Sequence, residues 1–164
     1  MIPVFAPISG AHFNPAVSMA AFGMGEMPAS RFVSYTAAQV FGGVIGVWIA
    51  HAMFAMPLLQ SSLKIRTGLA QWFSEIVATV VLLGTIRLGI KLANDRIALL
   101  VALIVTAGYW FTASTFFANP AVTIARSMTD TFAGIRPIDT VGFIVAQLIA
   151  VILVVGIELQ AGRK

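Results

Sequence analysis

The sequence predicts an all-α membrane protein that is organised as an inverted repeat with two half-helices, and three observations predict it. Of the 164 residues, 59% are hydrophobic and only 10% are charged, a composition far from that of a soluble domain. Several stretches lack any charged residue, and each exceeds the roughly 20 residues that an α-helix needs to cross the hydrocarbon layer. A motif around Asn-Pro-Ala also occurs twice.

Four membrane-spanning helices can be placed on the apolar stretches. Short polar or charged turns separate them, and their expected bounds are 32–54, 69–90, 97–114 and 140–160. Two hydrophobic pieces are left over, Met1 to Gly25 and Thr115 to Met128. Because proline interrupts each piece, neither is expected to form a continuous span.

The two leftover pieces are similar to each other. The run Asn14 to Ala20 matches the run Asn119 to Ala125, and each leads into a span that carries an Ala-Gln pair. Three spans lie between the two runs, an odd number, so the second copy enters the membrane from the opposite face. We therefore expect a single transmembrane domain over 1–164, with a partial first repeat in 1–60 and a second repeat in 68–160.

Each Asn-Pro-Ala triplet is expected to begin a short helix. Asn is a favoured N-cap and Pro is favoured at the first helical position. The two half-helices are expected at 14–24 and 119–128, and about ten residues at 1.5 Å each reach about 15 Å, half the hydrocarbon thickness. The triplets are Asn14-Pro15-Ala16 and Asn119-Pro120-Ala121. Entering from opposite faces, the half-helices are expected to meet near the midplane.

Two half-helix tips at the midplane predict a polar pore. Irregular backbone at that depth is tolerated around a cavity, and both helix dipoles direct partial positive charge at the centre, which opposes cations. If the side-chain oxygens of Asn14 and Asn119 cap their own helices, their amide N–H groups stay free to donate to a permeating oxygen. A water molecule held by two donors cannot pass a proton along a file of waters.

The composition excludes several function classes. The sequence has no cysteine, no paired His-Glu metal motif, no phosphate-binding Gly loop and only six carboxylate side chains, so we expect no enzyme, no metal site and no cofactor. Its ten basic residues are scattered singly or in pairs, as at the flanks of spanning helices. No nucleic-acid partner is expected. The expected partners are small neutral solutes and the lipid bilayer.

Five pieces of the sequence carry a resemblance to a known family: Ser9 to Val17, Ala38-Gln39, Ser74-Glu75 with Thr79, Phe117 to Ala121, and Ala146-Gln147. Together they resemble the major intrinsic protein family, the aquaporins and glycerol facilitators. The resemblance implies an aquaporin-like fold, a passive channel for small uncharged solutes, a multi-pass location in the cell (inner or plasma) membrane, and a homotetramer with one pore per subunit.

The chain departs from the family pattern at its N-terminus. The family normally has six spanning helices, and this chain is expected to lack the first and most of the second, of which Met1 to Ile8 is a remnant. Further in-frame codons upstream of Met1 that encode one and a half hydrophobic spans are expected to restore a complete channel.

Three positions of the family's selectivity filter carry over by their spacing from Asn119, and the fourth is expected before Met1, outside the chain. The three are Ala107, Phe116 and Val122. Most family members have Arg at the last position, where the cation narrows the opening and donates hydrogen bonds. With Val122 there, the resemblance implies a wider and less polar opening that suits glycerol, urea, water and undissociated arsenous acid, as in the bacterial aquaglyceroporins linked to arsenic resistance.

Five other residues are expected in the vestibule or the scaffold. His12 either lines the inner vestibule or has an ordinary packing role, and the resemblance implies that Glu75 accepts hydrogen bonds from a re-entrant loop. Gln39 and Gln147 are expected to be polar bridges between packed segments. Arg126 lies one turn beyond Val122 on the same helix face. It is expected to complement its helix dipole and reach the aqueous surface, and the alternative is that it replaces the missing filter cation.

Two other functions stay open from the sequence. Inverted repeats with broken helices also occur in ion-coupled secondary transporters, which need acidic ligands near the midplane. Glu75 is the only carboxylate deep within a predicted span, and intramembrane acids often mark proton relays. The third possibility is a shortened, non-conducting remnant of a channel that survives as a partner.

Overall fold

The computed structural model describes residues 1–162. Within that range every regular element is helical, so the prediction of an all-α membrane protein is confirmed. In chain order the elements are α1 (Ile2–Ser9), α2 (Pro15–Gly23), α3 (Ala29–Met53), α4 (Leu69–Leu92), η1 (Asn94–Arg96), α5 (Ile97–Phe111), α6 (Pro120–Arg126), η2 (Pro137–Asp139) and α7 (Thr140–Ala161).

Four helical segments within the described residues are long and apolar enough to cross a membrane, as the sequence predicts. They are Ala29–Met53, Leu69–Leu92, Asn94–Phe111 and Pro137–Ala161. The bounds differ from those expected by a few residues. The first span begins at Ala29 because the chain is extended at Pro28, whose carbonyl accepts the first helical hydrogen bond from Phe32. The third ends at Phe111 because Thr112 adopts an extended conformation.

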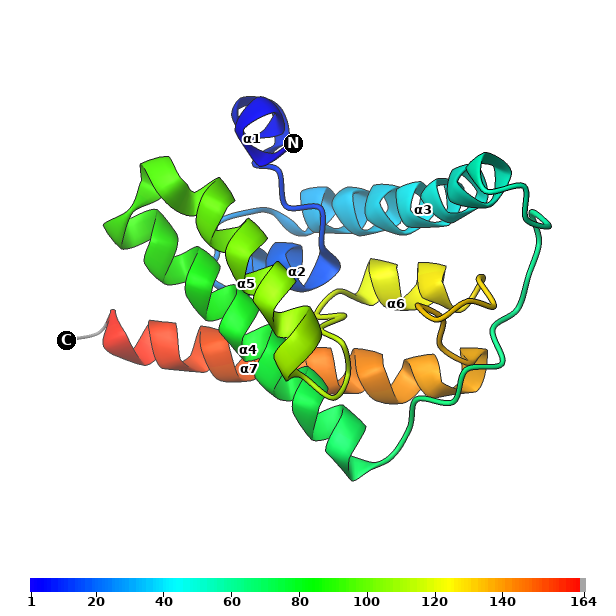
Figure 1. Cartoon of the computed structure of the whole chain (residues 1–164). Coiled ribbons are helices and arrows are strands. Elements are labelled where there is room, and N and C mark those ends of the chain that lie inside the picture. Colours follow the sequence, from blue (N-terminus) through cyan, green and yellow to red (C-terminus); the bar gives the residue numbers. More distant parts are fainter. Residues whose placement is uncertain (163–164) are drawn as a thin grey trace.

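The two half-helices, α2 and α6, lie between the long helices α3 and α7 and extend toward opposite ends of the molecule (Figure 1). Both are shorter than the bounds expected from the sequence. In α6 the helix ends at Arg126, where Ser127 N and Met128 N donate to the carbonyls three residues back, those of Ile124 and Ala125 (both 3.1 Å), instead of continuing the α-helical pattern. Neither half-helix is long enough to cross the hydrocarbon layer.

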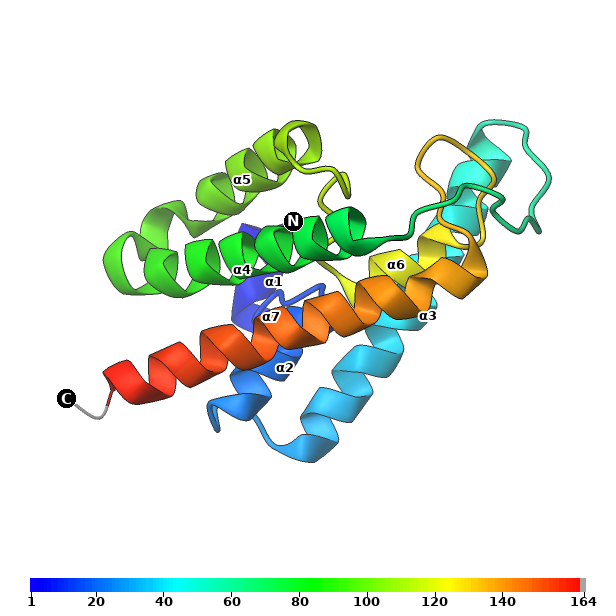
Figure 2. The same ribbon diagram turned by 90° about the horizontal axis from the view of Figure 1, so that it is seen from below.

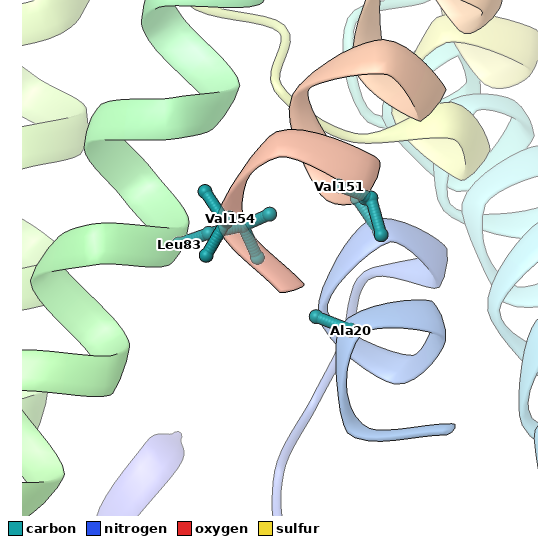
Figure 3. Close-up of a cluster of buried hydrophobic side chains, with 5 residues drawn as sticks. Ala20, Leu83, Val151 and Val154 are labelled. Atoms are coloured by element: carbon teal, nitrogen blue, oxygen red, sulfur yellow. The ribbon is translucent and has the colours of Figure 1, made fainter. Parts of the chain in front are cut away.

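The core lies where α4 and α7 pack along each other, with α5 on the other side of α4 (Figure 2). Gly142 of α7 allows this close approach, since a Cβ there would lie 2.3 Å from the Trp72 indole nitrogen of α4. A buried apolar cluster joins α2 to both helices (Figure 3). It contains Ala16, Ala20, Leu83, Val151 and Val154. Burial of this cluster fixes the position of the first half-helix.

Two connecting segments, 54–68 and 127–136, lie side by side at the end of the molecule where α6 ends. Backbone and side-chain hydrogen bonds join them: Ser62 N to Ser127 O (2.9 Å), Arg136 N to Lys64 O (2.7 Å) and Leu63 N to the Asp130 carboxylate (2.9 Å). His51, buried at the end of α3, adds contacts with Leu58 O and Thr129 Oγ1, both at 2.9 Å. These bonds satisfy backbone groups that have no strand or helix partner.

The outward faces of the long helices are apolar. On α3 the exposed large side chains are Val33, Phe41, Ile45, Trp48, Ile49 and Met53. A surface of this kind is costly in water and matches the hydrocarbon interior of a bilayer. With the four apolar spans, it identifies an integral membrane protein.

Candidate functional site

Both Asn-Pro-Ala triplets begin a helix in the same way. The Asn14 side-chain oxygen accepts a hydrogen bond from Ala16 N (2.8 Å), and the Asn119 oxygen accepts from Ala121 N (3.0 Å) and Val122 N (3.2 Å). Pro15 and Pro120 are the first residues of α2 and α6. Each asparagine therefore satisfies backbone N–H groups that the helix itself leaves unpaired.

The tips of the two half-helices contact each other through the same asparagines. The Asn14 amide nitrogen donates to the Ala118 carbonyl (2.7 Å), and the Asn119 amide nitrogen donates to the Phe13 carbonyl (3.1 Å). Each asparagine thus caps its own helix and binds the residue that precedes the other. Sequence reasoning left both N–H groups of each amide free. In the structure one of the two is used across the repeat, and one remains for a further acceptor.

The loops that enter the half-helices repeat an unusual backbone conformation. Ala11 and Phe13 have φ values of 50° and 48°, and their counterparts Phe116 and Ala118 have 51° and 46°. For residues other than glycine, this left-handed conformation costs about 1–3 kcal/mol and persists where the surrounding structure holds it. The conformation accompanies the reciprocal Asn contacts, whose acceptors are the carbonyls of Phe13 and Ala118. The inverted repeat is therefore visible in the backbone as well as in the sequence.

A cavity of about 540 Å³ runs past both asparagines. α1, α2, α4, α5 and α6 and the two entering loops line it. Its wall is largely apolar, with Val17, Leu83 and Val101 among its residues, and polar groups occur at a few places. A mostly apolar cavity with a few convergent polar groups is the usual form of a site for small molecules.

Two of the three filter positions named from the sequence line this cavity. Phe116, which is 5% exposed, forms part of the wall before Asn119, and Val122 lies one turn into α6. Ala107 is exposed and does not line the cavity; from α5 the lining residues are Ile97, Val101 and Val105. Its neighbour Gly108 is buried against Phe116, where a Cβ would lie 2.1 Å from the Phe116 ring. The filter role of Ala107 stays a prediction.

Glu75 and Gln147 hold the loop that enters α6. A carboxylate oxygen of Glu75 accepts hydrogen bonds from Ala118 N and from the Gln147 amide nitrogen (2.7 Å), which also lies 2.9 Å from Thr123 Oγ1. Glu75, Thr123 and Gln147 are each 0% exposed. This arrangement matches the scaffold contact expected for Glu75, because the carboxylate binds the backbone beside the second triplet.

The first half-helix has a partly equivalent set of contacts. Gln39 of α3 donates to the Ser18 hydroxyl (3.1 Å), as Gln147 of α7 donates to Thr123. His12 Nδ1 lies 3.1 Å from the same Ser18 oxygen, and its ring lines the cavity. A second cavity of about 440 Å³ lies between α3 and α6 and is lined by both His12 and Gln39. His12 therefore both faces a cavity and makes a packing contact.

Three polar residues at one end of the cavity were not found from the sequence: Glu26, Arg87 and Asn94. The Arg87 guanidinium pairs with Glu26 (2.7 Å) and with Glu158 (2.6 Å), and Lys91 also pairs with Glu158 (2.6 Å). These residues come from segments far apart in the sequence, and no local motif marks them. Only the packing of α4 against α7 and the α2 loop brings them together.

Comparison with known proteins gives one family throughout. The family model of the major intrinsic proteins matches residues 1–96. The aquaglyceroporin AqpS of Rhizobium meliloti (strain 1021) is 49% identical over 152 residues, which cover 93% of this chain and 65% of that protein. An aquaglyceroporin of Toxoplasma gondii is 35% identical over 91 residues, or 51% of this chain and 32% of the relative.

A third relative is aquaporin-7 of Botryotinia fuckeliana, 32% identical over 157 residues, which cover 90% of this chain and 34% of that protein. The chain thus spans about two thirds or less of the length of these relatives. The family match, the extended similarity to an aquaglyceroporin and the apolar spans agree with the resemblance found in the sequence. The chain belongs to the major intrinsic protein family.

Proposed function

We propose that the protein is a passive transmembrane channel for small uncharged solutes, with glycerol, urea, water and undissociated arsenous acid as the candidate solutes. The observation that carries this proposal is the meeting of the Asn14 and Asn119 side chains at one cavity. Each asparagine has one amide N–H left after its contact with the opposite loop. Both asparagines line the cavity, so two donors from opposite half-helices are available there to a solute oxygen.

The chemistry of the wall favours a neutral, partly apolar solute. Phe116, Val17 and Val122 offer no hydrogen bond, so a solute that presents carbon on one side and oxygen on the other suits the cavity better than a fully hydrated ion. An ion that enters a cavity with such a wall loses much of its hydration, and the apolar side chains do not replace the lost contacts with water. The dipoles of α2 and α6 add partial positive charge near their N-termini, which disfavours cations.

We propose a role for each of the residues named in the site. Asn14-Pro15-Ala16 and Asn119-Pro120-Ala121 form the central constriction, Phe116 and Val122 set the apolar wall of the filter, and Ala107 provides a third filter position. Glu75, Gln39 and Gln147 hold the entering loops, and His12 lines the vestibule. The proposed domain is one channel unit over 1–164 with half-helices in 14–24 and 119–128.

We further propose that the channel resides in the inner or plasma membrane as a homotetramer. The exposed apolar face of α3 provides surface for lipid or for a neighbouring subunit. Native mass spectrometry of the detergent-purified protein tests the subunit number. A purely monomeric spectrum, in a detergent where the protein stays folded, contradicts the tetramer.

The channel is tested by stopped-flow light scattering of proteoliposomes that hold the full-length gene product. Gradients of glycerol, urea and arsenous acid are expected to cause swelling faster than that of empty vesicles. Flux is expected to be independent of imposed proton or sodium gradients, which separates a channel from a coupled transporter. Rates equal to those of empty vesicles reject the proposal.

Two matched variants test whether the solute passes along the cavity beside Val122. Val122→Trp fills the cavity and is expected to reduce glycerol flux to the level of empty vesicles. Val145→Trp makes the same change on an exposed position of α7 and is expected to leave flux unchanged. Equal flux from the two variants contradicts a path past Val122.

A further inference from the structure

Arg126 is a cation in the wall of the main cavity. It is the last residue of α6 and lies one turn beyond Val122 on the same face. The cavity is lined by Arg126 together with both asparagines. The sequence alone left two roles open for this side chain, a cation at the aqueous surface or a donor facing the pore.

The Arg126 guanidinium is held by an aromatic ring rather than by a carboxylate. It stacks on Phe117 at 4.2 Å from the ring centroid, and Phe117 is 4% exposed. Such a contact orients a guanidinium while leaving its N–H groups in the plane available. Arg126 makes no salt bridge within residues 1–162. No carboxylate is therefore in direct contact with its guanidinium among these residues.

The second arginine on the same ring has a different role. Arg66 lies 5.2 Å from the Phe117 centroid, and its guanidinium donates to Gly134 O (2.8 Å) and Phe132 O (3.2 Å). Burial lowers the pKa of Arg66 from its ordinary value, yet a guanidinium stays charged at neutral pH. Arg66 is thus committed to the outer loops. The two like charges repel, which opposes movement of Arg126 toward Arg66.

One donor of Arg126 lacks an acceptor. The Nη1 nitrogen is buried and has no hydrogen-bond partner among the described residues. Buried donors on charged groups are almost always paired, because an unpaired one loses its hydration without compensation. Because Arg126 lines the cavity, a small movement of the side chain would bring this nitrogen to an acceptor among the contents of the cavity.

We propose that Arg126 is a specificity-determining residue of the pore, which donates a hydrogen bond to the oxygen of a neutral solute and repels cations. The inference rests on the proposed channel function. Val122, one turn nearer Asn119, has no donor, so Arg126 is the cationic donor that α6 presents to this cavity. Neutral solutes with a hydroxyl or carbonyl oxygen gain a contact there, whereas potassium ions and protons meet a positive charge that has no carboxylate in direct contact.

The test compares three variants in proteoliposomes of the full-length gene product. Arg126→Met removes the charge at similar length, Arg126→Lys keeps the charge without the planar fork, and Arg31→Met makes the first change at an exposed position of α3. Glycerol swelling and potassium flux, followed with a potassium-sensitive dye, are measured on each. We expect Arg126→Met to raise potassium flux at least tenfold over wild type, and Arg126→Lys and Arg31→Met to stay at the wild-type level.

The outcomes separate this inference from the channel itself. The role of Arg126 alone is overturned if the wild-type protein conducts glycerol and a folded Arg126→Met variant still conducts water and excludes potassium as wild type does. Wild-type vesicles no more permeable to glycerol than empty ones would overturn both proposals.

A measurement on the unmodified protein covers the case in which Arg126→Met does not fold. In solid-state NMR with ¹⁵N-labelled arginine, addition of glycerol is expected to shift the Arg126 guanidinium signal and to leave that of Arg31 in place. An Arg126 signal that does not move at glycerol concentrations that saturate the flux contradicts the proposed contact.

Discussion

Replacement of Glu75 tests how the second half-helix is held. Its carboxylate accepts hydrogen bonds from Ala118 N and Gln147 Nε2, and all three groups lie in the buried interior. In Glu75→Leu both donors lose this acceptor. A buried donor left without a partner costs about 1–3 kcal/mol, so the variant is expected to lose about 2–6 kcal/mol of unfolding free energy.

Glu75→Gln is the matched control. The glutamine oxygen can accept the same two hydrogen bonds, and its amide group takes the place of Oε2, which has no partner in the described residues. The variant loses the added strength of a charged acceptor and places amide N–H groups at the unpartnered Oε2 position, which together we expect to cost about 1–3 kcal/mol, less than the loss in Glu75→Leu. The assay is unfolding of the purified protein in mixed micelles of increasing SDS content. Equal stability of the Leu and Gln variants refutes this account of Glu75.

The same pair distinguishes a channel from a proton-coupled transporter. If Glu75 is a scaffold residue, Glu75→Gln keeps the entering loop in place and glycerol flux stays near the wild-type rate. If Glu75 carries protons, glutamine cannot titrate and transport is lost. Loss of flux in a stable Glu75→Gln protein therefore favours the transporter.

Three further predictions concern packing around the cavity. Arg87→Met removes the ion pairs with Glu26 and Glu158 and is expected to lower the free energy of unfolding by about 1–2 kcal/mol at low salt. The loss is expected to be smaller at high salt because these groups are partly exposed, and SDS unfolding at two salt concentrations measures it. Gly108→Ala forces the Phe116 ring to move and is expected to lower the free energy of unfolding by about 1–3 kcal/mol. Gly46→Ala on α3 meets open space and is expected to raise it by up to about 1 kcal/mol. Thermal unfolding that ranks the two variants in the reverse order contradicts the packing described. His51→Phe removes the contacts with Leu58 and Thr129 and is expected to speed hydrogen exchange in 54–68 and 127–136, while unchanged exchange shows that other bonds hold these segments.

The helices were predictable because their signals are local. An Asn-Pro pair sets both the cap and the first helical residue, and the apolar stretches exceed the length of a span. The odd number of spans between Asn14 and Asn119 then requires the two tips to come from opposite faces. The structure agrees in the arrangement of α2 and α6 and in the reciprocal contacts of the two asparagines.

The finer geometry of the site depends on contacts that have no local signal. Phe13 and Ala118 adopt a left-handed conformation without being glycine, so the sequence does not predict that their carbonyls accept hydrogen bonds from the opposite asparagine. Likewise, the stacking of Arg126 on Phe117 depends on how the entering loop folds back on α6. The rotation of α5, which leaves Ala107 exposed, depends on its packing against α4. Spacing alone cannot supply these tertiary relations.

The most direct test of the central claim is the contact between Asn119 and Phe13 in the membrane. Solid-state NMR of the protein in lipid, labelled with ¹⁵N in asparagine side chains and ¹³C in phenylalanine carbonyls, measures the dipolar coupling between these atoms. We expect a coupling from the Asn119 amide nitrogen to the Phe13 carbonyl carbon, since that nitrogen lies 3.1 Å from the carbonyl oxygen, and its loss in Asn119→Asp. Absence of the coupling in folded, membrane-embedded protein contradicts a pore at which the two half-helices meet.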